Sequence, residues 1–433
     1  MNLFKYFPPD RGETTGDVDI AVGSVAAGVL PRDGSPYGRL LHIPGATLLR
    51  HRLASLWRKE RAFCRCCVTL ELISSRAVTL GRNDYVSLGK DALKRLVGAE
   101  DNKNVLRVLL EAGFIESDGF AIVGKKCFGY RLTAEAAAMP VELVEVEDAA
   151  LSAFQAYKET RRLEAIRSHP AHLLVWDALQ TAVLDPLGEA LGPQSDPDPE
   201  KYARRRWHWF ETIRRMQERD FFFSADYKAQ RLHHTVSGMP KELRRYLRLN
   251  GEPCAETDLS NCQPLLMYRL YPSGSTEAAR YAELVEAGLF YETLAAASRI
   301  SWPDRDELKR QVYIQILYDR VRSQAPLWIA FQRAFPEMAA IIAELKRVDY
   351  RQLSIANQKA EADIVVRTVI PRLARELPGV PVLTVHDSLL IPERFAEQGR
   401  RALEEEVERA IGITPKVELK RSALTHSQER FVA

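Results

Sequence analysis

The chain has 433 residues, of which 46% are hydrophobic and 27% charged, a composition typical of globular domains and not of disordered or fibrous chains. Its 61 Lys and Arg residues nearly balance 58 Asp and Glu residues, and this formal net charge of +3 excludes a uniformly basic coat protein but not a local basic groove. The six cysteines, with Cys64, Cys66 and Cys67 crowded together, match neither a disulfide framework nor zinc-finger spacing. Because there is no apolar run of ~20 residues and no signal-peptide pattern, we expect a cytoplasmic protein without membrane contact.

The N-terminal third is predicted to contain an arm and a small domain. Residues 1–47 are rich in Gly, Pro and Asp and have no hydrophobic period, which predicts an irregular arm or an extended strand packed on another element. Within residues 48–140, apolar spacing and terminal glycines predict short helices over 91–98 and 104–112. A strand–turn–strand pattern follows over 114–123.

Helix, helix and a two-stranded wing form the pattern of a winged helix-turn-helix. Such modules often contact nucleic acid through basic residues of the second helix or the wing, and here Lys125, Lys126 and Arg131 are the candidates. A packing or protein–protein module is an equal alternative, because the predicted second helix offers only Lys103 and Arg107.

Residues 141–230 are expected to form a helical connector with a surface loop over 186–199, where Pro, Gly, Ser and Asp are frequent. The segment 204–215 mixes arginines with Trp207 and Trp209, a combination that suits phosphate contact and stacking on bases or sugars. Taken alone, this segment is better explained as a solvated helix face with buried Trp residues. We nevertheless carry forward the hypothesis that it touches phosphates.

A carboxylate stands at the end of a predicted strand in segment 256–264. There a short β-run ends at Asp258, and a helix is expected to begin near Pro264. A carboxylate at a strand end is held rigidly and can face a metal ion. The alternative is that Asp258 caps the helix.

Arg305, Lys309 and Tyr313 are spaced four residues apart. On a helix they form one stripe of two cations and a ring. A triphosphate needs positive charge and a base needs a flat face, so this stripe suits a nucleotide. An ordinary amphipathic helix has the same spacing.

Amides mark the start of a further predicted helix, which runs over 357–363 into an apolar body. The side chains of Asn357 and Gln358 could contact groove acceptors that all base pairs share, which suits sequence-independent binding of a nucleic-acid duplex. The alternative is a capped, half-buried helix.

Two apolar β-runs flank His386 and Asp387, which predicts a hairpin whose tight turn presents a carboxylate at the sheet edge. A His-Asp pair also occurs in metal phosphohydrolases. That class needs further histidine ligands nearby, and the neighbouring sequence supplies none.

Together these segments resemble the palm and fingers of family A DNA polymerases and of their relatives, the phage-type single-subunit RNA polymerases. The resembling residues are Asp258, Ser260 and Gln263 of the first palm motif, Arg305, Lys309 and Tyr313 of the fingers helix, 358–363 of the helix before the last motif, and 385–388 of the last palm motif. Weaker similarity is found at 231–234, 241–245 and 288–291. The resemblance spans residues 200–420.

The resemblance implies an α+β fold. It places a right-hand polymerase palm on an antiparallel sheet, with helical fingers, over residues 231–433, after thumb-like helices over 141–230 and the winged-helix-like domain over 48–140. It implies two Mg²⁺ ions (or Mn²⁺), because in-line nucleotidyl transfer uses a pair of such ions. The expected partners are a DNA template-primer or an RNA–DNA hybrid and nucleoside triphosphates, bound by a monomer.

The resemblance also implies roles for individual residues. Asp258, Asp387 and the carbonyl of Leu259 would hold metal, and Lys309 and His386 would join the two aspartates in catalysis. The substrate-binding residues would be Arg305, Lys309, Tyr313, Gln263 and Tyr318. The nucleic-acid-binding residues would be Arg231, Lys241, Arg244, Arg245, Asn357 and Gln358.

Three positions depart from the family pattern. Gln263 stands where the DNA enzymes usually have Glu, Ser388 follows the aspartate as in the RNA enzymes, and Ile314 replaces a Gly. We favour a compact DNA polymerase without a proofreading exonuclease, because Gln263 is bulky enough to crowd a 2′-hydroxyl. The alternatives are a single-subunit RNA polymerase or primase-like enzyme, and a DNA-binding initiator or regulator with an inactive palm.

Overall fold

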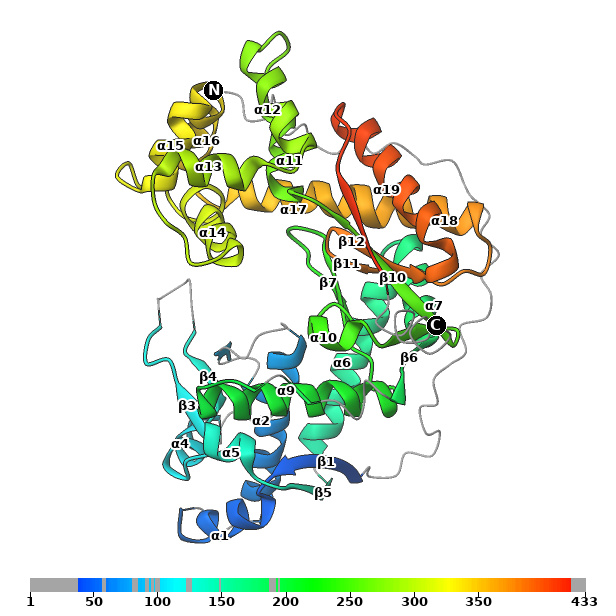
Figure 1. The fold of residues 1–433 in the computed structure, drawn as a ribbon. Helices are drawn as coiled ribbons and strands as arrows, with labels where there is room; N and C mark the ends of the chain where they lie inside the picture. The colour runs from blue at the N-terminus through cyan, green and yellow to red at the C-terminus, as the bar shows by residue number, and fades with distance from the viewer. Residues whose placement is uncertain are drawn as a thin grey trace. The chain divides into compact units, whose positions relative to one another are not determined.

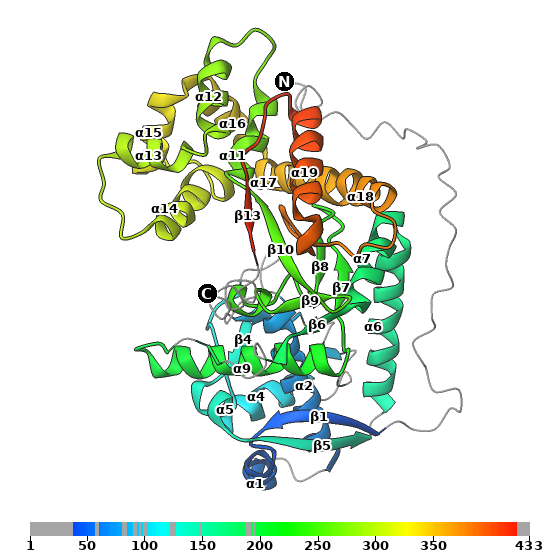
Figure 2. The same cartoon turned by 45° about the vertical axis from the view of Figure 1, so that its right-hand side comes forward.

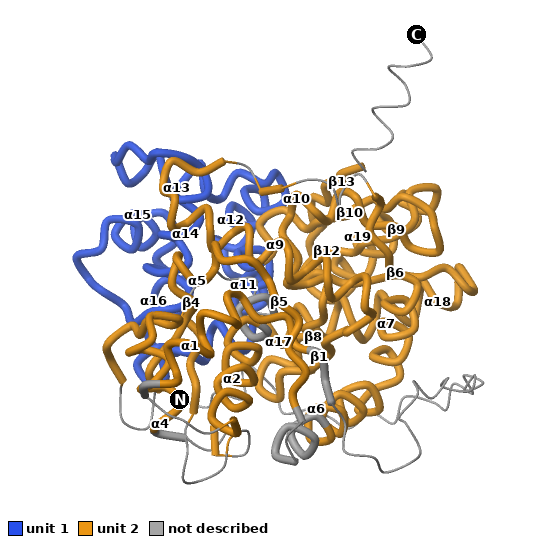
Figure 3. Tube along the Cα trace, turned by 90° about the horizontal axis from the view of Figure 1, so that it is seen from below, with its two compact units in different colours: residues 1–36, 263–357 blue, residues 37–262, 358–433 orange. Residues whose placement is uncertain are grey.

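The computed structural model describes residues 38–56, 60–79, 85–89, 93–94, 97, 102–121, 127–147, 149–186, 192–193 and 195–421. These residues form helices and antiparallel sheets (Figure 1), as the expected fold class requires. They belong to two compact units (Figure 3). The described part of unit 1 is residues 263–357, and unit 2 contains the described residues of 37–262 and 358–433. The domain boundaries expected after residues 47, 140 and 230 stay predictions.

The N-terminal part of unit 2 forms two small antiparallel sheets and several helices. Its elements are β1 (Gly38–Pro44), α1 (Ala46–Leu56), α2 (Glu60–Thr79), β2 (Val86–Ser87), α4 (Asn102–Glu111), β3 (Ile115–Ser117), β4 (Gly129–Leu132), α5 (Ala134–Ala138) and β5 (Val141–Glu147). Strand β1 pairs with β5, and β4 lies between β2 and β3. Residues 38–44 of the expected arm are therefore an extended strand, and residues 1–37 lie outside the described part of the chain.

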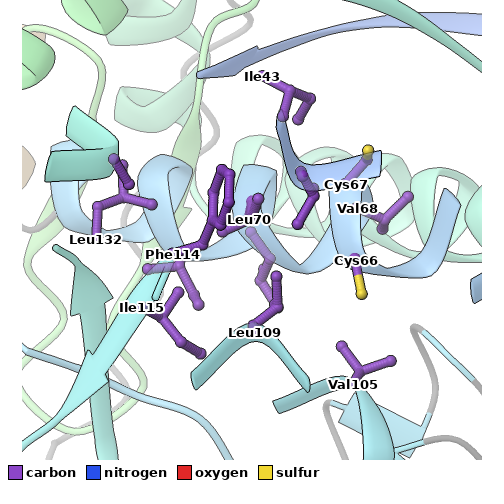
Figure 4. Packing of buried hydrophobic residues seen from close by; sticks show 14 of the residues in the cluster. Ile43, Cys66, Cys67, Val68, Leu70, Val105, Leu109, Phe114, Ile115 and Leu132 are labelled. Atoms are coloured by element: carbon purple, nitrogen blue, oxygen red, sulfur yellow. The ribbon is translucent and has the colours of Figure 1, made fainter. Parts of the chain in front are cut away.

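A hydrophobic core lies between α2 and α4 (Figure 4). Cys66 and Leu70 of α2 and Val105 and Leu109 of α4 are each 0% exposed. Burial raises the pKa of the Cys66 thiol to about 12, so this side chain stays protonated and packs as a small apolar group. Cys64 and Cys67 are buried in the same core, and all three are free cysteines.

The partner of the first strand expected over 114–123 is formed by other residues than predicted. The helix predicted over 104–112 is α4, and β3 confirms the first strand. Phe120 and Ala121, however, are in no strand, and the partner of β3 is β4, whose Gly129 N–H donates to the Asp118 carboxylate (2.9 Å). Of the helix expected over 91–98, residues 93, 94 and 97 are described, and these are helical. Lys125 and Lys126 lie outside the described residues.

Residues 149–217 of unit 2 contain α6 (Ala149–Arg167), α7 (Pro170–Gln180), β6 (Ala182–Leu184) and α9 (Pro199–Gln217).

Helix α9 contradicts the phosphate-contact hypothesis for two of its arginines. Arg214 and Arg215 are 6% and 3% exposed and both donate to the Glu211 carboxylate, at 2.6 and 3.0 Å. Trp207 and Trp209 are buried as well. The two arginines therefore balance a buried carboxylate.

A six-stranded sheet forms the centre of unit 2. Its strands are β9 (Leu247–Leu249), β10 (Glu252–Leu259), β11 (Leu383–Val385), β12 (Ser388–Pro392) and β13 (Val417–Lys420), together with β6. Strand β10 pairs with β12, β9 and β13, and Figure 2 shows β13 beside β10. Helix α19 (Ala396–Ile411) packs on this sheet through Gly399, where an added Cβ would lie 3.3 Å from Ile391.

Further short elements of unit 2 precede and follow the sheet strands. They are the hairpin strands β7 (Phe223–Ala225) and β8 (Leu232–His234), the short helix α10 (Lys241–Arg244), the π-helical segment Val365–Val369 and α18 (Ile370–Glu376).

Unit 1 is helical within its described residues. Its helices are α11 (Cys262–Met267), α12 (Thr276–Glu286), α13 (Phe290–Ser298), α14 (Arg305–Val312), the π-helical segment Tyr313–Tyr318, α15 (Pro326–Ala334), α16 (Pro336–Val348) and the first half of α17 (Gln352–Ile364). Aromatic rings fill its core: Tyr281, Phe290, Phe331 and Phe335 contact one another at centroid distances of 4.9 to 6.3 Å.

Candidate active site

Asp258 lies on strand β10 of the central sheet of unit 2, and Asp387 lies in the turn that leads into the neighbouring strand β12. Asp258 is the penultimate residue of β10, and its register partner on β12 is Ser388, which directly follows Asp387. Val385 pairs with Ser388, so His386 and Asp387 form the two-residue turn of the predicted hairpin. His386 has φ +58°, a left-handed conformation that such turns require. Antiparallel pairing thus brings together two aspartates that are far apart in sequence.

The buried thiol of Cys262 is close to both aspartates. Cys262 is 4% exposed, at the start of α11. Burial and the negative charges of Asp387, Glu361 and Asp258 raise its pKa well above the ordinary value. The Glu361 carboxylate lies 3.9 Å from the sulfur. Glu361, which contacts the thiol, was not predicted as a site residue.

A lysine near the end of the chain contacts Asp258. Lys420 Nζ lies 2.5 Å from Asp258 Oδ2, and the two side chains are 50% and 30% exposed. The register of β10 and β13 brings them together, because it pairs Glu256 with Lys420 and Asp258 with Glu418. Partial burial lowers the pKa of Lys420, but the hydrogen bond and charge of Asp258 outweigh it, so the pKa is raised overall. Lys420 was not predicted either.

Arg231 contacts Glu361, and His386 precedes Asp387 in the turn. Arg231 donates to Glu361 at 2.5 Å. The ring of His386 contacts that of His233 at a centroid distance of 5.7 Å. Burial and then the positive charge of Arg231 lower the pKa of His386 to about 3, so the imidazole is neutral at physiological pH. A neutral His386 can position a hydroxyl group but does not supply positive charge.

Arg244 is buried beside Glu256 of β10. It is 8% exposed, and its guanidinium lies 3.5 Å from Glu256 Oε1, which also accepts a hydrogen bond from Ser388 Oγ (3.1 Å). Arg244 therefore does not present its charge to a nucleic-acid backbone in this structure. Lys241 and Arg245, on and just after the same short helix, are exposed.

The predicted stripe of unit 1 is present on α14 and the π-helical turn that follows it. Arg305 is exposed and forms an ion pair with Glu292 at 2.9 Å. Lys309 Nζ lies 5.7 Å from the centroid of the Tyr313 ring, which contacts that of Tyr318 at 5.3 Å. The opposite side is apolar, since Leu308, Val312, Ile316 and Leu317 are buried. π-Helical turns of this kind are frequent at functional sites.

Asn357 has an internal role that the sequence did not predict. Helix α17 begins at Gln352, so Asn357 lies in its middle and not at its start. It is 0% exposed, donates to the Gln263 carbonyl (3.3 Å) and lies 3.5 Å from Arg269 Nη2. Its amide is therefore occupied within unit 1. Gln263 is 3% exposed, and Gln358 is half-buried.

The donor set fits a hard divalent cation that retains water ligands. Mg²⁺ is typically bound by one or two protein carboxylates, with water and phosphate completing its coordination, and Asp258 and Asp387 supply two carboxylates. Among the residues that the structure describes, no three His, Cys, Asp or Glu side chains form a group that could hold a metal ion. Leu259 ends β10, and its register partner is Val417 of β13.

No helix within the described ranges is long and apolar enough to cross a membrane. No protein-family model and no curated protein matches the chain. Among solved structures, the chain is similar to the POL domain of Pol1 from M. smegmatis, determined in complex with DNA primer-template and dNTP. The TM-score is 0.35 and the identity 14%, and the match covers 63% of this chain and 65% of that one, just under two thirds. A match of this extent does not establish a family for the chain.

Proposed function

We propose that the chain is a template-dependent nucleotidyltransferase, a compact DNA polymerase without a proofreading exonuclease. The observation that supports this most is the pairing of β10 with β12, which brings Asp258 next to the turn that carries Asp387. Both carboxylates also raise the pKa of the same buried thiol, that of Cys262. Two acids held by paired strands and their tight turn are what metal-dependent phosphoryl transfer needs.

Asp258 and Asp387 would hold Mg²⁺ or Mn²⁺, with the Leu259 carbonyl as a further ligand. When bound, such ions lower the pKa of the attacking 3′-hydroxyl and stabilise the leaving pyrophosphate. The neutral imidazole of His386 would orient the primer end. Ion pairing with Glu361 would hold Arg231 close to the same turn.

The nucleotide would be bound by the stripe of unit 1. Arg305 and Lys309 would offset the charge of the triphosphate, and Tyr313 would stack on the incoming base. The exposed cations Lys241 and Arg245 would contact the nucleic-acid backbone. In the N-terminal part, we propose that α4 with β2, β4 and β3 forms a winged-helix-like module.

The test is extension of a labelled primer on a DNA template by the full chain, with dNTPs or rNTPs and with or without a primer. We expect dNTP-dependent extension that is lost in the Asp387→Asn and Asp258→Asn variants, with circular dichroism showing that both still fold. Extension that survives either substitution would refute the assignment of that residue. Preferential use of rNTPs, or synthesis without a primer, would favour the RNA polymerase or primase alternative, to which Ser388 points.

One observation favours a binding protein with an inactive palm instead. The ion pair between Lys420 and Asp258 already satisfies one of the two aspartates. If the chain acts only by binding DNA, Asp387→Ala will leave its activity in cells intact, whereas the polymerase proposal requires complete loss.

A further inference from the structure

We propose that Lys420 is a built-in competitor of the divalent cation: its ammonium group occupies Asp258 in the metal-free protein and must leave when the metal binds. The inference rests on the proposed function, since it takes Asp258 as a metal ligand. It adds a residue outside every motif discussed above, on the last strand of the described chain. Lys420 would thereby set how much Mg²⁺ or Mn²⁺ the site requires.

The contact is specific in geometry. The nitrogen lies 2.5 Å from Asp258 Oδ2, so the two charged groups are in direct contact. Four consecutive register pairs between β10 and β13 fix Lys420 opposite Glu256, so that Asp258, two residues further along β10, is its diagonal neighbour. The nearest other carboxylate contact of the ammonium is weaker, at 3.9 Å to Glu418. The ammonium therefore stands in for a cation on the Asp258 carboxylate.

The pair is also placed so that it can open. The Lys420 side chain is 50% exposed and that of Asp258 is 30% exposed, so water can solvate the ammonium as soon as it moves away. Pairs with this exposure contribute little net stability. Lysine has a flexible four-carbon stem, so the ammonium can leave while β13 stays paired. A dication attracts the carboxylate more strongly than a single positive charge does, which gives the exchange its direction.

The test is direct measurement of Mn²⁺ binding to the full-length protein, by electron paramagnetic resonance of free Mn²⁺ with Mg²⁺ as competitor. Lys420→Met removes the charge and keeps a stem of similar length. Because one positive charge a few ångströms from a dication is lost, we expect the dissociation constant for Mn²⁺ to fall on the order of tenfold. Lys420→Arg keeps the charge and should bind Mn²⁺ about as weakly as the wild type does.

Lys416→Met is the matched control, because this exposed lysine lies just before the same strand. Lys416 stands opposite Ser260, two residues from Asp258, but forms no ion pair with Asp258 in the described part of the chain. Its removal should therefore leave the affinity within about twofold of wild type, since screening weakens an exposed charge that does not contact the carboxylate. In a double variant, Asp258→Asn should abolish the gain in Mn²⁺ affinity that Lys420→Met produces. Circular dichroism of each variant checks that the sheet is intact.

An unchanged or weaker Mn²⁺ affinity in Lys420→Met, or no Mn²⁺ binding by either protein, would overturn the competitor role. Failure of the proposed function looks different. In that case Lys420→Met tightens Mn²⁺ binding as expected, but neither it nor the wild type extends a primer. Conversely, a wild type that extends primers while Lys420→Met leaves the affinity unchanged keeps the polymerase and removes only the competitor.

Discussion

The buried ion pair of Arg231 and Glu361 gives a prediction whose size follows from its burial. Glu361 is 3% exposed, the Arg231 side chain is 17% exposed, and the nitrogen–oxygen distance is 2.5 Å. Replacing one member of a buried pair leaves the other charge uncompensated, at a cost of about 3 kcal/mol or more. We therefore expect Glu361→Gln to lower the free energy of unfolding by about 3 kcal/mol. Primer extension should fall as well, because Arg231 loses the carboxylate that holds it near His386.

The assay is urea unfolding followed by circular dichroism, with Arg231→Met and the double variant completing a double-mutant cycle. Glu376→Gln is the control, because its carboxylate pairs with Arg372 at 2.7 Å but its side chain is 47% exposed. Such a surface pair contributes about 1 kcal/mol at most. If Glu361→Gln destabilises the protein no more than this control does, the account of a buried, mutually dependent pair is wrong.

Three further predictions concern packing, pH and salt. Gly399→Val should destabilise the protein by about 1–3 kcal/mol in thermal unfolding, because an added Cβ would already lie 3.3 Å from Ile391. Burial lowers the pKa of His234 from 6.5 to about 4, so its contribution to stability is complete above pH 6.5 and is lost as the pH falls towards 4. Urea unfolding of the wild type and His234→Gln across this range should show a flatter dependence in the variant. In DNA binding, Arg245→Met should reduce the slope of log affinity against log salt by about 1. Arg215→Met should leave that slope unchanged and lower stability instead, because Arg215 is buried against Glu211.

Local patterns in the sequence were sufficient for the hairpin that carries Asp387 and for the helix that carries Arg305 and Lys309. The hairpin at His386 and Asp387 was predictable because two apolar runs are separated by a turn of two residues, a spacing that leaves few alternatives. The helix with Arg305 and Lys309 was predictable because its apolar positions recur every three to four residues.

What the sequence did not predict depends on partners far away in the chain. Glu361 lies close to Arg231, and Lys420 close to Asp258, only because helix and strand packing brings them together. Their local patterns are those of an ordinary helix and an ordinary strand end. Arg215 is a case in which the partner is near in sequence. The basic run around it suggested a phosphate contact, but Arg215 forms an ion pair with Glu211, four residues earlier on the same helix.

The alternation of buried and partly exposed residues along β10 fixes the position of Asp258 in the sheet. Ala255 and Thr257 are each 0% exposed and Leu259 is 6% exposed, whereas Glu256 and Asp258 on the other face are partly exposed. A shift of the register by one residue would bury the two carboxylates and expose the apolar face, so burial of the apolar face fixes the pairing with β12. The same pairing determines which residue stands beside the turn of Asp387. The residues that bring the two acids together are therefore the buried neighbours of Asp258 as much as Asp258 itself.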